Sequence, residues 1–267
     1  MIRIPTIFLF FAVFSVSFLS CGKNQMTGNP AGPAILPGLS YGDSIFYSTN
    51  QQDYIVTPKE TRTGKYTGFP EGIVINESTG AINVTKSDAG LKYRVSFVAS
   101  GTSDTISTFI TIGGINYLDG FYKLSTRDSI LHPVYNASVA NVIPGINNGS
   151  VFDIGSNCNN NGCTVNVKNG EINLAQTVRN GVFGAKPSNN DRHEFDLVYN
   201  IRDNNLQSAS TIRVKLYYFD TMNDVTPEAY QIISERQGTI LGAVPTVSAT
   251  VVKPARPRPP CIFIVSR

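Results

Sequence analysis

The sequence contains no tryptophan and only two histidines, and 15% of its residues are charged. The formal net charge is +3, which is too small an excess of basic residues to indicate a nucleic-acid partner. The lack of tryptophan disfavours a sugar-stacking platform, although twelve tyrosines can supply aromatic faces. The surface is therefore expected to be polar through Asn, Ser and Thr rather than through charge.

Catalytic and metal-binding patterns are also missing. There is no G-x-S-x-G nucleophile elbow, and His132 precedes Pro133, which favours an extended backbone. His193 and Glu194 are adjacent, so on a strand they would point to opposite faces rather than to one metal ion. We expect no enzymatic activity, no metal and no cofactor. A pair of carboxylates for glycoside hydrolysis stays open, because their separation depends on tertiary structure.

The composition favours β structure. Val, Ile, Thr, Tyr and Phe are plentiful, and 23 glycines and 15 prolines supply turns between short strands. Residues 93–99 and 106–112 alternate apolar and polar positions, as half-buried antiparallel strands do. We predict a mostly β protein, with an immunoglobulin-like β-sandwich over 39–113 and a second β-rich domain with one short helix over 114–267. In the first domain the expected strands are Ser44–Ser48, Tyr54–Thr57, Gly72–Ile75, Ala81–Val84, Lys92–Ala99 and Thr105–Gly113.

The N-terminus has the pattern of an export signal. Arg3 precedes an apolar run, Ile7–Leu19, which is too short to span a bilayer comfortably. The residues Phe18-Leu19-Ser20-Cys21 resemble the lipobox of bacterial lipoproteins, with Phe18 in place of the usual leucine. The resemblance implies that residues 1–20 are removed, that Cys21 carries the lipid and that the protein is an outer-membrane lipoprotein. Residues 21–38, rich in Gly, Pro and Asn, are expected to form a tether.

Residues 35–113 resemble bacterial immunoglobulin- and cadherin-like repeats. The resemblance rests on Phe69–Asn83, which reads FPEGIVINESTGAIN, and on Tyr93–Ala99, which reads YRVSFVA. It implies a β-sandwich that serves as a spacer, an adhesive stalk or a binding platform. The acidic clusters of calcium-dependent cadherins are missing, so calcium is not expected.

The second half resembles no family. Residues 114–122 are expected to join the two halves, and Glu194–Ile201 with Ile212–Phe219 to form a long hairpin. Thr226, Pro227 and Glu228 predict a helix start, with the helix ending near Gly238. Cys261–Val265 is predicted as a final strand after a basic, proline-rich segment, 253–260.

Three cysteines follow Cys21. Cys158 and Cys163 flank Asn159-Asn160-Asn161-Gly162, a tight-turn signal between the predicted strands 152–154 and 164–167, so they are a possible disulfide pair. Pairing of Cys261 with either of them stays open. The same stretch fits the start of a calcium loop, but its twelfth position is Lys168 rather than the required glutamate.

Four hydroxyls follow an aspartate and precede an apolar residue, a pattern that resembles the O-glycosylation sequon of Bacteroidetes. They are Ser44, Thr105, Ser129 and Thr221. The resemblance implies that these hydroxyls carry glycans in an exported protein of that phylum.

Three functions fit these observations. The first is a membrane-anchored, non-enzymatic binding or adhesion module, or an envelope scaffold, whose partner is an unknown protein or glycan. The second is a glycan-processing hydrolase in residues 123–267. The third is a structural envelope subunit that pairs with a partner through its C-terminal strand.

Overall fold

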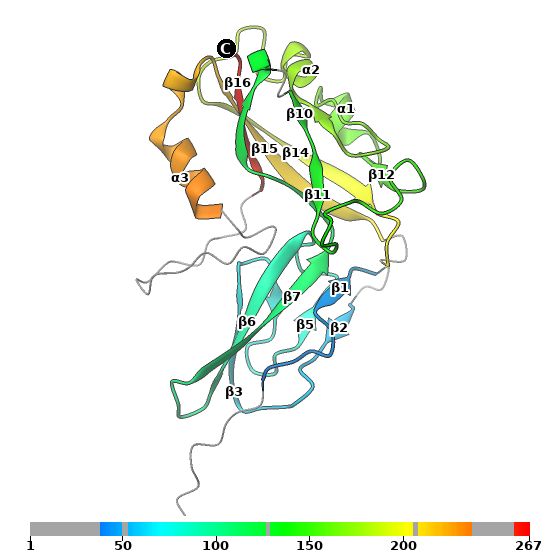
Figure 1. Ribbon diagram of the computed structural model, residues 1–267, viewed down its shortest axis with the longest axis vertical. Coiled ribbons are helices and arrows are strands. Elements are labelled where there is room, and N and C mark those ends of the chain that lie inside the picture. Colours follow the sequence, from blue (N-terminus) through cyan, green and yellow to red (C-terminus); the bar gives the residue numbers. More distant parts are fainter. Residues whose placement is uncertain (1–37, 50–52, 127–128, 205–207, 237–258) are drawn as a thin grey trace, which may run out of the picture. The chain divides into compact units, whose positions relative to one another are not determined.

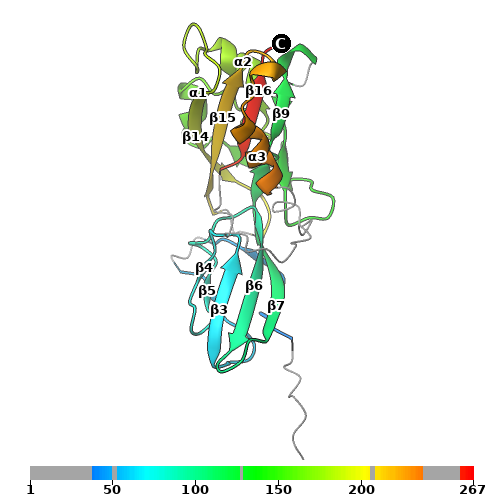
Figure 2. The ribbon, with the colours of Figure 1, turned by 90° about the vertical axis from the view of Figure 1, so that its left-hand side faces the viewer.

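A computed structural model describes residues 38–49, 53–126, 129–204, 208–236 and 259–267, and the protein is mostly β, as predicted (Figures 1 and 2). The signal segment, Cys21 and the tether up to residue 37 lie outside the described residues. Among the described helices, none combines the length and the apolar composition needed to cross a membrane.

Residues 38–113 form two sheets around one hydrophobic core. One sheet has the order β1-β7-β6-β3 and the other the order β2-β5-β4. Their strands are β1 (Ile45–Tyr47), β2 (Ile55–Val56), β3 (Gly64–Phe69), β4 (Val74–Ile75), β5 (Ile82–Asn83), β6 (Leu91–Ala99) and β7 (Thr105–Gly113). All six expected strands are present in this part, and two facing sheets make it a sandwich.

The core of the sandwich follows the alternation of β6. Tyr93, Val95 and Phe97 are buried on one face of the strand, because side chains alternate across a sheet. The sequence pattern missed β3, which pairs antiparallel with β6. Of its six residues only Tyr66 is buried, and Gly64 and Gly68 interrupt any apolar alternation.

Residues 114–267 contain a five-stranded sheet with the order β12-β14-β15-β16-β9. The predicted hairpin is confirmed as β14 (Asp191–Asn200) and β15 (Ser210–Phe219), which pair antiparallel over most of their length. The other strands of this sheet are β12 (Val151–Phe152), β16 (Cys261–Val265) and β9 (Gly120–Lys123). Two short antiparallel pairs lie outside it. In one, β8 (Ile115–Tyr117) pairs with β11 (Pro133–Tyr135), and in the other, β10 (Ile130–Leu131) pairs with β13 (Ile172–Asn173).

The strand β16 lies inside this sheet. It pairs in parallel with β15 on one side and with β9 on the other, and all five of its residues are buried. Ile262 and Ile264 pack into the core beneath β14 and β15, whereas Phe263 packs on the opposite face, toward α3 (Pro227–Arg236). The expected pairing with a partner through this strand is therefore wrong, because both of its edges are already paired.

Two further expectations for the second half are corrected. Residues 115–117 and 120–123 are strands of the fold rather than a connector, because Ile115 and Tyr117 are fully buried in its core. The predicted helix is confirmed as α3, but the described residues contain two more, α1 (Asn157–Asn160) and α2 (Leu174–Arg179). Thr164–Val167 makes only a single bridge, Val165 to Ile172, instead of a strand.

Candidate binding groove

A polar groove of about 380 Å³ lies along the outer edge of β14, and we call it the β14 groove. Its walls come from Asn157 and Asn161 of α1, from His193–Asp196 of β14 and from Arg213 of β15. A second hollow of about 640 Å³ is lined by His193 and by residues 159–162 and 180–182. It shares Asn161 and His193 with the β14 groove. The two form one amide-rich surface beside α1.

A buried carboxylate holds α1 in place. Asp153 accepts hydrogen bonds from the backbone N–H of Cys158 at 2.8 Å and of Asn159 at 3.0 Å, and from Asn159 Nδ2 at 2.7 Å. Asn157 Nδ2 then donates to the carbonyl oxygen of Asp196 at 3.1 Å, which joins the helix to β14. Figure 2 shows α1 beside β14 at this edge of the sheet.

Both carboxylates of the β14 groove are engaged with basic residues of β15. Arg213 donates through Nε and Nη2 to the two oxygens of Asp196 at 2.7 and 3.0 Å, and this guanidinium lowers the pKa of Asp196 below its usual 3.8. Glu194 lies opposite Lys215 in the strand register, and their charged groups are 2.8 Å apart. The lowered pKa makes Asp196 a poor proton donor at neutral pH.

His193 is the polar side chain of the β14 groove that has no hydrogen-bond partner among the described residues. Its ring is half-buried and lies 4.6 Å, between centroids, from the ring of Phe195. His132 does not line the groove and instead pairs with Glu171 through Nδ1 at 3.0 Å. Within the described residues, no group of three or more His, Cys, Asp or Glu side chains is placed to hold a metal ion.

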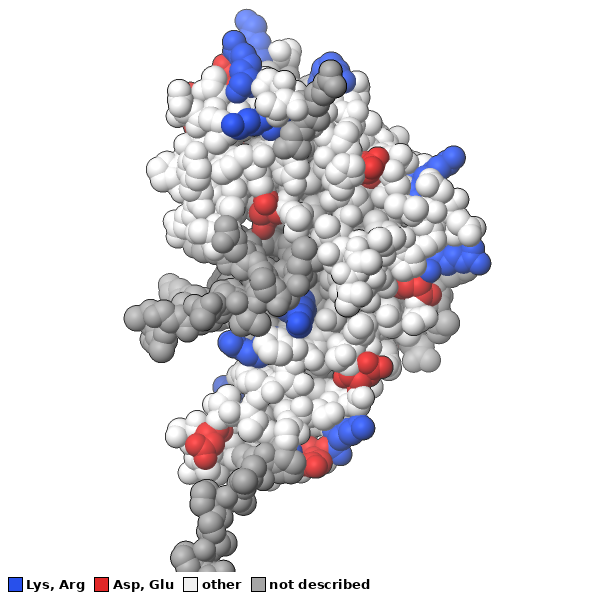
Figure 3. Space-filling model, viewed as in Figure 1, with Lys and Arg blue, Asp and Glu red and all other residues white. Residues whose placement is uncertain are grey.

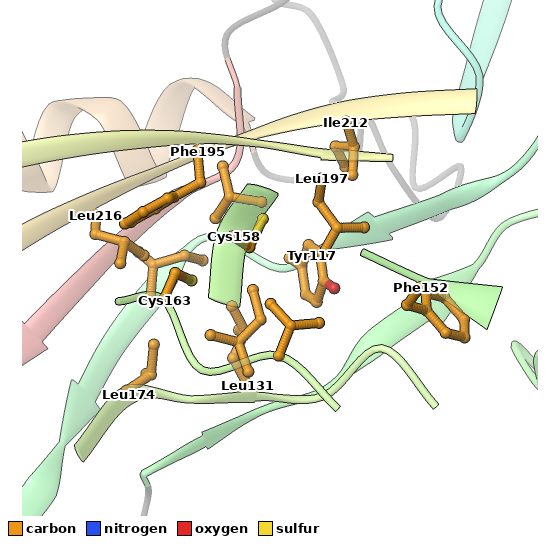
Figure 4. Packing of buried hydrophobic residues seen from close by; sticks show 14 of the residues in the cluster. Tyr117, Leu131, Phe152, Cys158, Cys163, Leu174, Phe195, Leu197, Ile212 and Leu216 are labelled. Atoms are coloured by element: carbon orange, nitrogen blue, oxygen red, sulfur yellow. The ribbon is translucent and has the colours of Figure 1, made fainter. Parts of the chain in front are cut away.

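The three described cysteines are free, buried thiols. Cys158 and Cys163 are 1% and 0% exposed and sit in the main core of the second half, beside Tyr117 and Leu131 (Figure 4). The residues between them form α1 and its final turn rather than a hairpin turn, because Asp153 caps the helix. The possible disulfide is not formed in this structure, and Cys261 also keeps a free thiol, which donates to the carbonyl of Pro259.

The four predicted glycosylation hydroxyls differ in access. Ser44 and Thr105 are exposed, whereas Ser129 and Thr221 are half-buried. Thr221 Oγ1 donates to Asp224 at 2.6 Å as part of a capping box, which limits its access further. Modification of these residues stays a prediction, and so does lipidation of Cys21.

The sequence pattern drew attention to His193 and Glu194 but did not place α1 next to them. Asp153 lies three residues before the N-cap, Ser156, so it does not occupy the position at which Asp marks a helix start in a sequence. The Asn-Gly pair was the stronger local signal, and it predicted a hairpin turn instead.

Comparison with known proteins identifies no family for this chain. No family model matches it, and no curated protein matches it. Among solved structures, human protocadherin-24 EC1-2, form II, is 8% identical, covers 68% of this chain and 96% of its own, and has a TM-score of 0.22. Drosophila OTK, extracellular domains 3–5, is 9% identical, covers 67% of this chain and 65% of its own, and has a TM-score of 0.19. Scores this low carry no inference about function.

Proposed function

We propose that this protein is an exported lipoprotein of a bacterial envelope, anchored through Cys21, that binds a partner without catalysing a reaction. Residues 39–113 serve as a cadherin- or immunoglobulin-like spacer, and residues 114–267 present the binding surface. The lipid anchor is inferred from the lipobox-like sequence Phe18–Cys21 and from the tether-like segment that follows it.

The observation that supports binding rather than catalysis is the state of the carboxylates in the β14 groove. A glycoside hydrolase needs one carboxylic acid with a raised pKa as its proton donor. Asp196 has a lowered pKa because Arg213 holds it, and Glu194 is paired with Lys215. This arrangement disfavours a hydrolase site in the β14 groove and suits a surface that presents fixed polar groups.

A nucleic-acid partner is not part of the proposal. Figure 3 shows basic and acidic side chains scattered over the visible face, without a basic stripe. Several basic side chains are neutralised by neighbours, such as Arg213 by Asp196 and Arg267 by Asp220. Binding to phosphate backbones requires clustered, unpaired positive charge.

The anchor is tested by growing cells with radioactive palmitate and fractionating them. We expect the wild-type chain and a Lys23→Ala control to carry the label and to sediment with membranes. The Cys21→Ala chain should lose the label and appear in the soluble fraction. If the wild type takes no label and the Cys21→Ala chain stays with membranes, the proposed anchor is wrong.

A further inference from the structure

Alternate backbone groups of β14 face away from the sheet, along the β14 groove. The N–H of Lys215 donates to the carbonyl of Pro260 at 2.9 Å, on the β16 side, so Lys215 does not exchange hydrogen bonds with Glu194 opposite it. Successive residues of an antiparallel ladder alternate between the two sides. The N–H and C=O groups of Glu194, Arg192 and Asp196 therefore point outward, away from β15.

Hydrogen bonds at the far end of the strand support this assignment. The carbonyl of Val198 accepts from Ile154 N–H at 2.9 Å, and the carbonyl of Asp196 accepts from Asn157 Nδ2 at 3.1 Å. Both acceptors belong to the outward set, and both donors lie outside the β14–β15 hairpin.

The outer edge of β14 is paired only near its end. The two residues of β12 pair with Tyr199 and Asn200, and α1 covers the carbonyl of Asp196. Within the described residues, no strand and no side chain bonds the outward backbone groups of Arg192 and Glu194. In the part of the chain that the structure describes, an unpaired row of donors and acceptors thus borders the β14 groove.

Exposed sheet edges are usually protected by charged side chains that project across them. Here the charged side chains are turned onto the face of the sheet and held by β15. Arg192 lies 5.0 Å from the ring centroid of Tyr217, Glu194 pairs with Lys215, and Asp196 pairs with Arg213. These contacts leave the backbone edge accessible.

We propose that an extended peptide segment of a partner protein adds to β14 along Arg192–Asp196 as a further strand. This rests on the proposed binding function and names its ligand class. The peptide backbone bonds the outward groups of Arg192 and Glu194, which gives affinity without sequence preference. Alternate peptide side chains enter the β14 groove over His193, which supplies the preference. The open edge runs from Arg192 to the N–H of Asp196, because the Asp196 carbonyl already accepts from Asn157, and it is about 14 Å long at roughly 3.4 Å per residue.

The edge favours a peptide over a glycan. The ring of Phe195 is only 4% exposed, so the groove offers no broad aromatic face for a sugar ring. Backbone donors and acceptors that repeat every second residue instead match the spacing of another extended chain.

The test uses a phage-displayed library of random dodecapeptides selected on the full chain in detergent micelles. The protein variant is Glu194→Pro, with Glu194→Ala as the matched control. Proline removes the outward N–H of residue 194 and blocks the edge, yet it removes no bond to β15. We expect peptides from the selection to bind Glu194→Pro at least tenfold more weakly than Glu194→Ala, because both variants lack the carboxylate and only proline also removes the outward N–H.

A second measurement leaves the protein unchanged, in case Glu194→Pro does not fold. N-methylation of successive amides of a selected peptide should weaken binding at least tenfold at every second position and little at the positions between. The amide of Glu194 should also exchange with solvent at least tenfold more slowly when the peptide is bound. Absence of enriched peptides, or N-methyl effects without alternation, overturns the proposal.

Other outcomes separate this inference from the proposed function. If a glycan panel binds the chain and Glu194→Pro leaves that binding intact, strand addition is wrong but the binding function stands. If the wild type is a dimer that Glu194→Pro makes monomeric, the edge pairs with a second copy, and a partner peptide is wrong. If neither peptides nor glycans bind, both proposals fall.

Discussion

At the scale of single residues, the two neighbouring thiols behave as small apolar side chains. The pKa of the Cys158 thiol is raised well above its ordinary value by its hydrogen bond with Cys163 and by burial. A thiol reacts as its thiolate, so this environment suppresses both alkylation and oxidation. In this structure Cys158 and Cys163 pack beside Tyr117 and Leu131 without a crosslink (Figure 4).

We expect the folded Cys21→Ala chain to react very slowly with a thiol reagent. Unfolding in guanidinium without reductant should then release three reactive thiols, those of Cys158, Cys163 and Cys261. The measurement is a colorimetric thiol count in native and denaturing buffer, and a reduced, denatured sample is the control. A count of one thiol before reduction would show that two of the cysteines are joined.

The ion pair of Asp196 and Arg213 gives stability that depends on pH. The folded pKa of Asp196 is lowered, so its contribution is present above the unfolded value of about 4 and is lost as pH falls through the folded pKa. The pair is largely exposed, so its contribution should be below about 1 kcal/mol.

We therefore expect Asp196→Asn to be slightly less stable than wild type at pH 7, with a smaller difference at pH 3. Urea unfolding at both pH values measures the two free energies of unfolding, and Asp104→Asn, at an exposed site, is a control for loss of one surface carboxylate. A difference that grows toward acid pH would contradict this sign.

At the scale of elements, β16 is the strand on which the second half depends most. Its residues face two packed clusters, with Ile264 in one and Phe263 in the other. We expect Ile264→Ala to lower the free energy of unfolding by about 2–5 kcal/mol. Val142→Ala, at a site 62% exposed, should change it by less than about 0.5 kcal/mol. Urea unfolding of both variants is the measurement, and similar small effects would place Ile264 outside the core.

Sequence patterns predicted those elements whose own residues carry an apolar rhythm. The alternation of Tyr93, Val95 and Phe97 sufficed for β6, and the apolar run of β16 marked a strand. The apolar run did not reveal that β16 lies in the interior of its sheet, because a short apolar run has the same composition in an edge strand as in a central strand. β3 was not predicted because two of its residues are glycines, which have a low strand propensity. It forms a strand because it pairs with β6, and this tertiary contact is not visible in the local sequence.

The β14 groove was only half predictable for a related reason. The pair His193-Glu194 is visible in the sequence, and their opposite orientations follow from strand geometry. Two features decide which backbone groups of β14 stay open. One is the point at which its pairing with β12 ends, at Tyr199 of β14, and the other is the position of α1. Both are set by contacts between segments about 40 residues apart, which no local pattern contains.

At the scale of the whole molecule, the buried residues form separate hydrophobic clusters. One cluster contains Tyr66, Tyr93 and Ile110, all within residues 39–112, and another contains Tyr117, Leu197 and Ile264, all within residues 115–264. The two clusters share no buried residue, but Val134 of the second half packs against the first cluster. The domain boundary expected near residue 113 stays a prediction.

If the boundary is real, each part should open by its own cooperative unfolding step. Ile110→Ala removes a side chain that is 1% exposed and should weaken the first part by about 2–5 kcal/mol. Hydrogen exchange should then speed up for the amides of β6 and remain unchanged for those of β14. Leu197→Ala, at a fully buried site of the other cluster, should give the reverse pattern. If either variant accelerates exchange equally in both strands, residues 39–267 unfold as one unit, and the spacer and the binding surface are parts of a single domain.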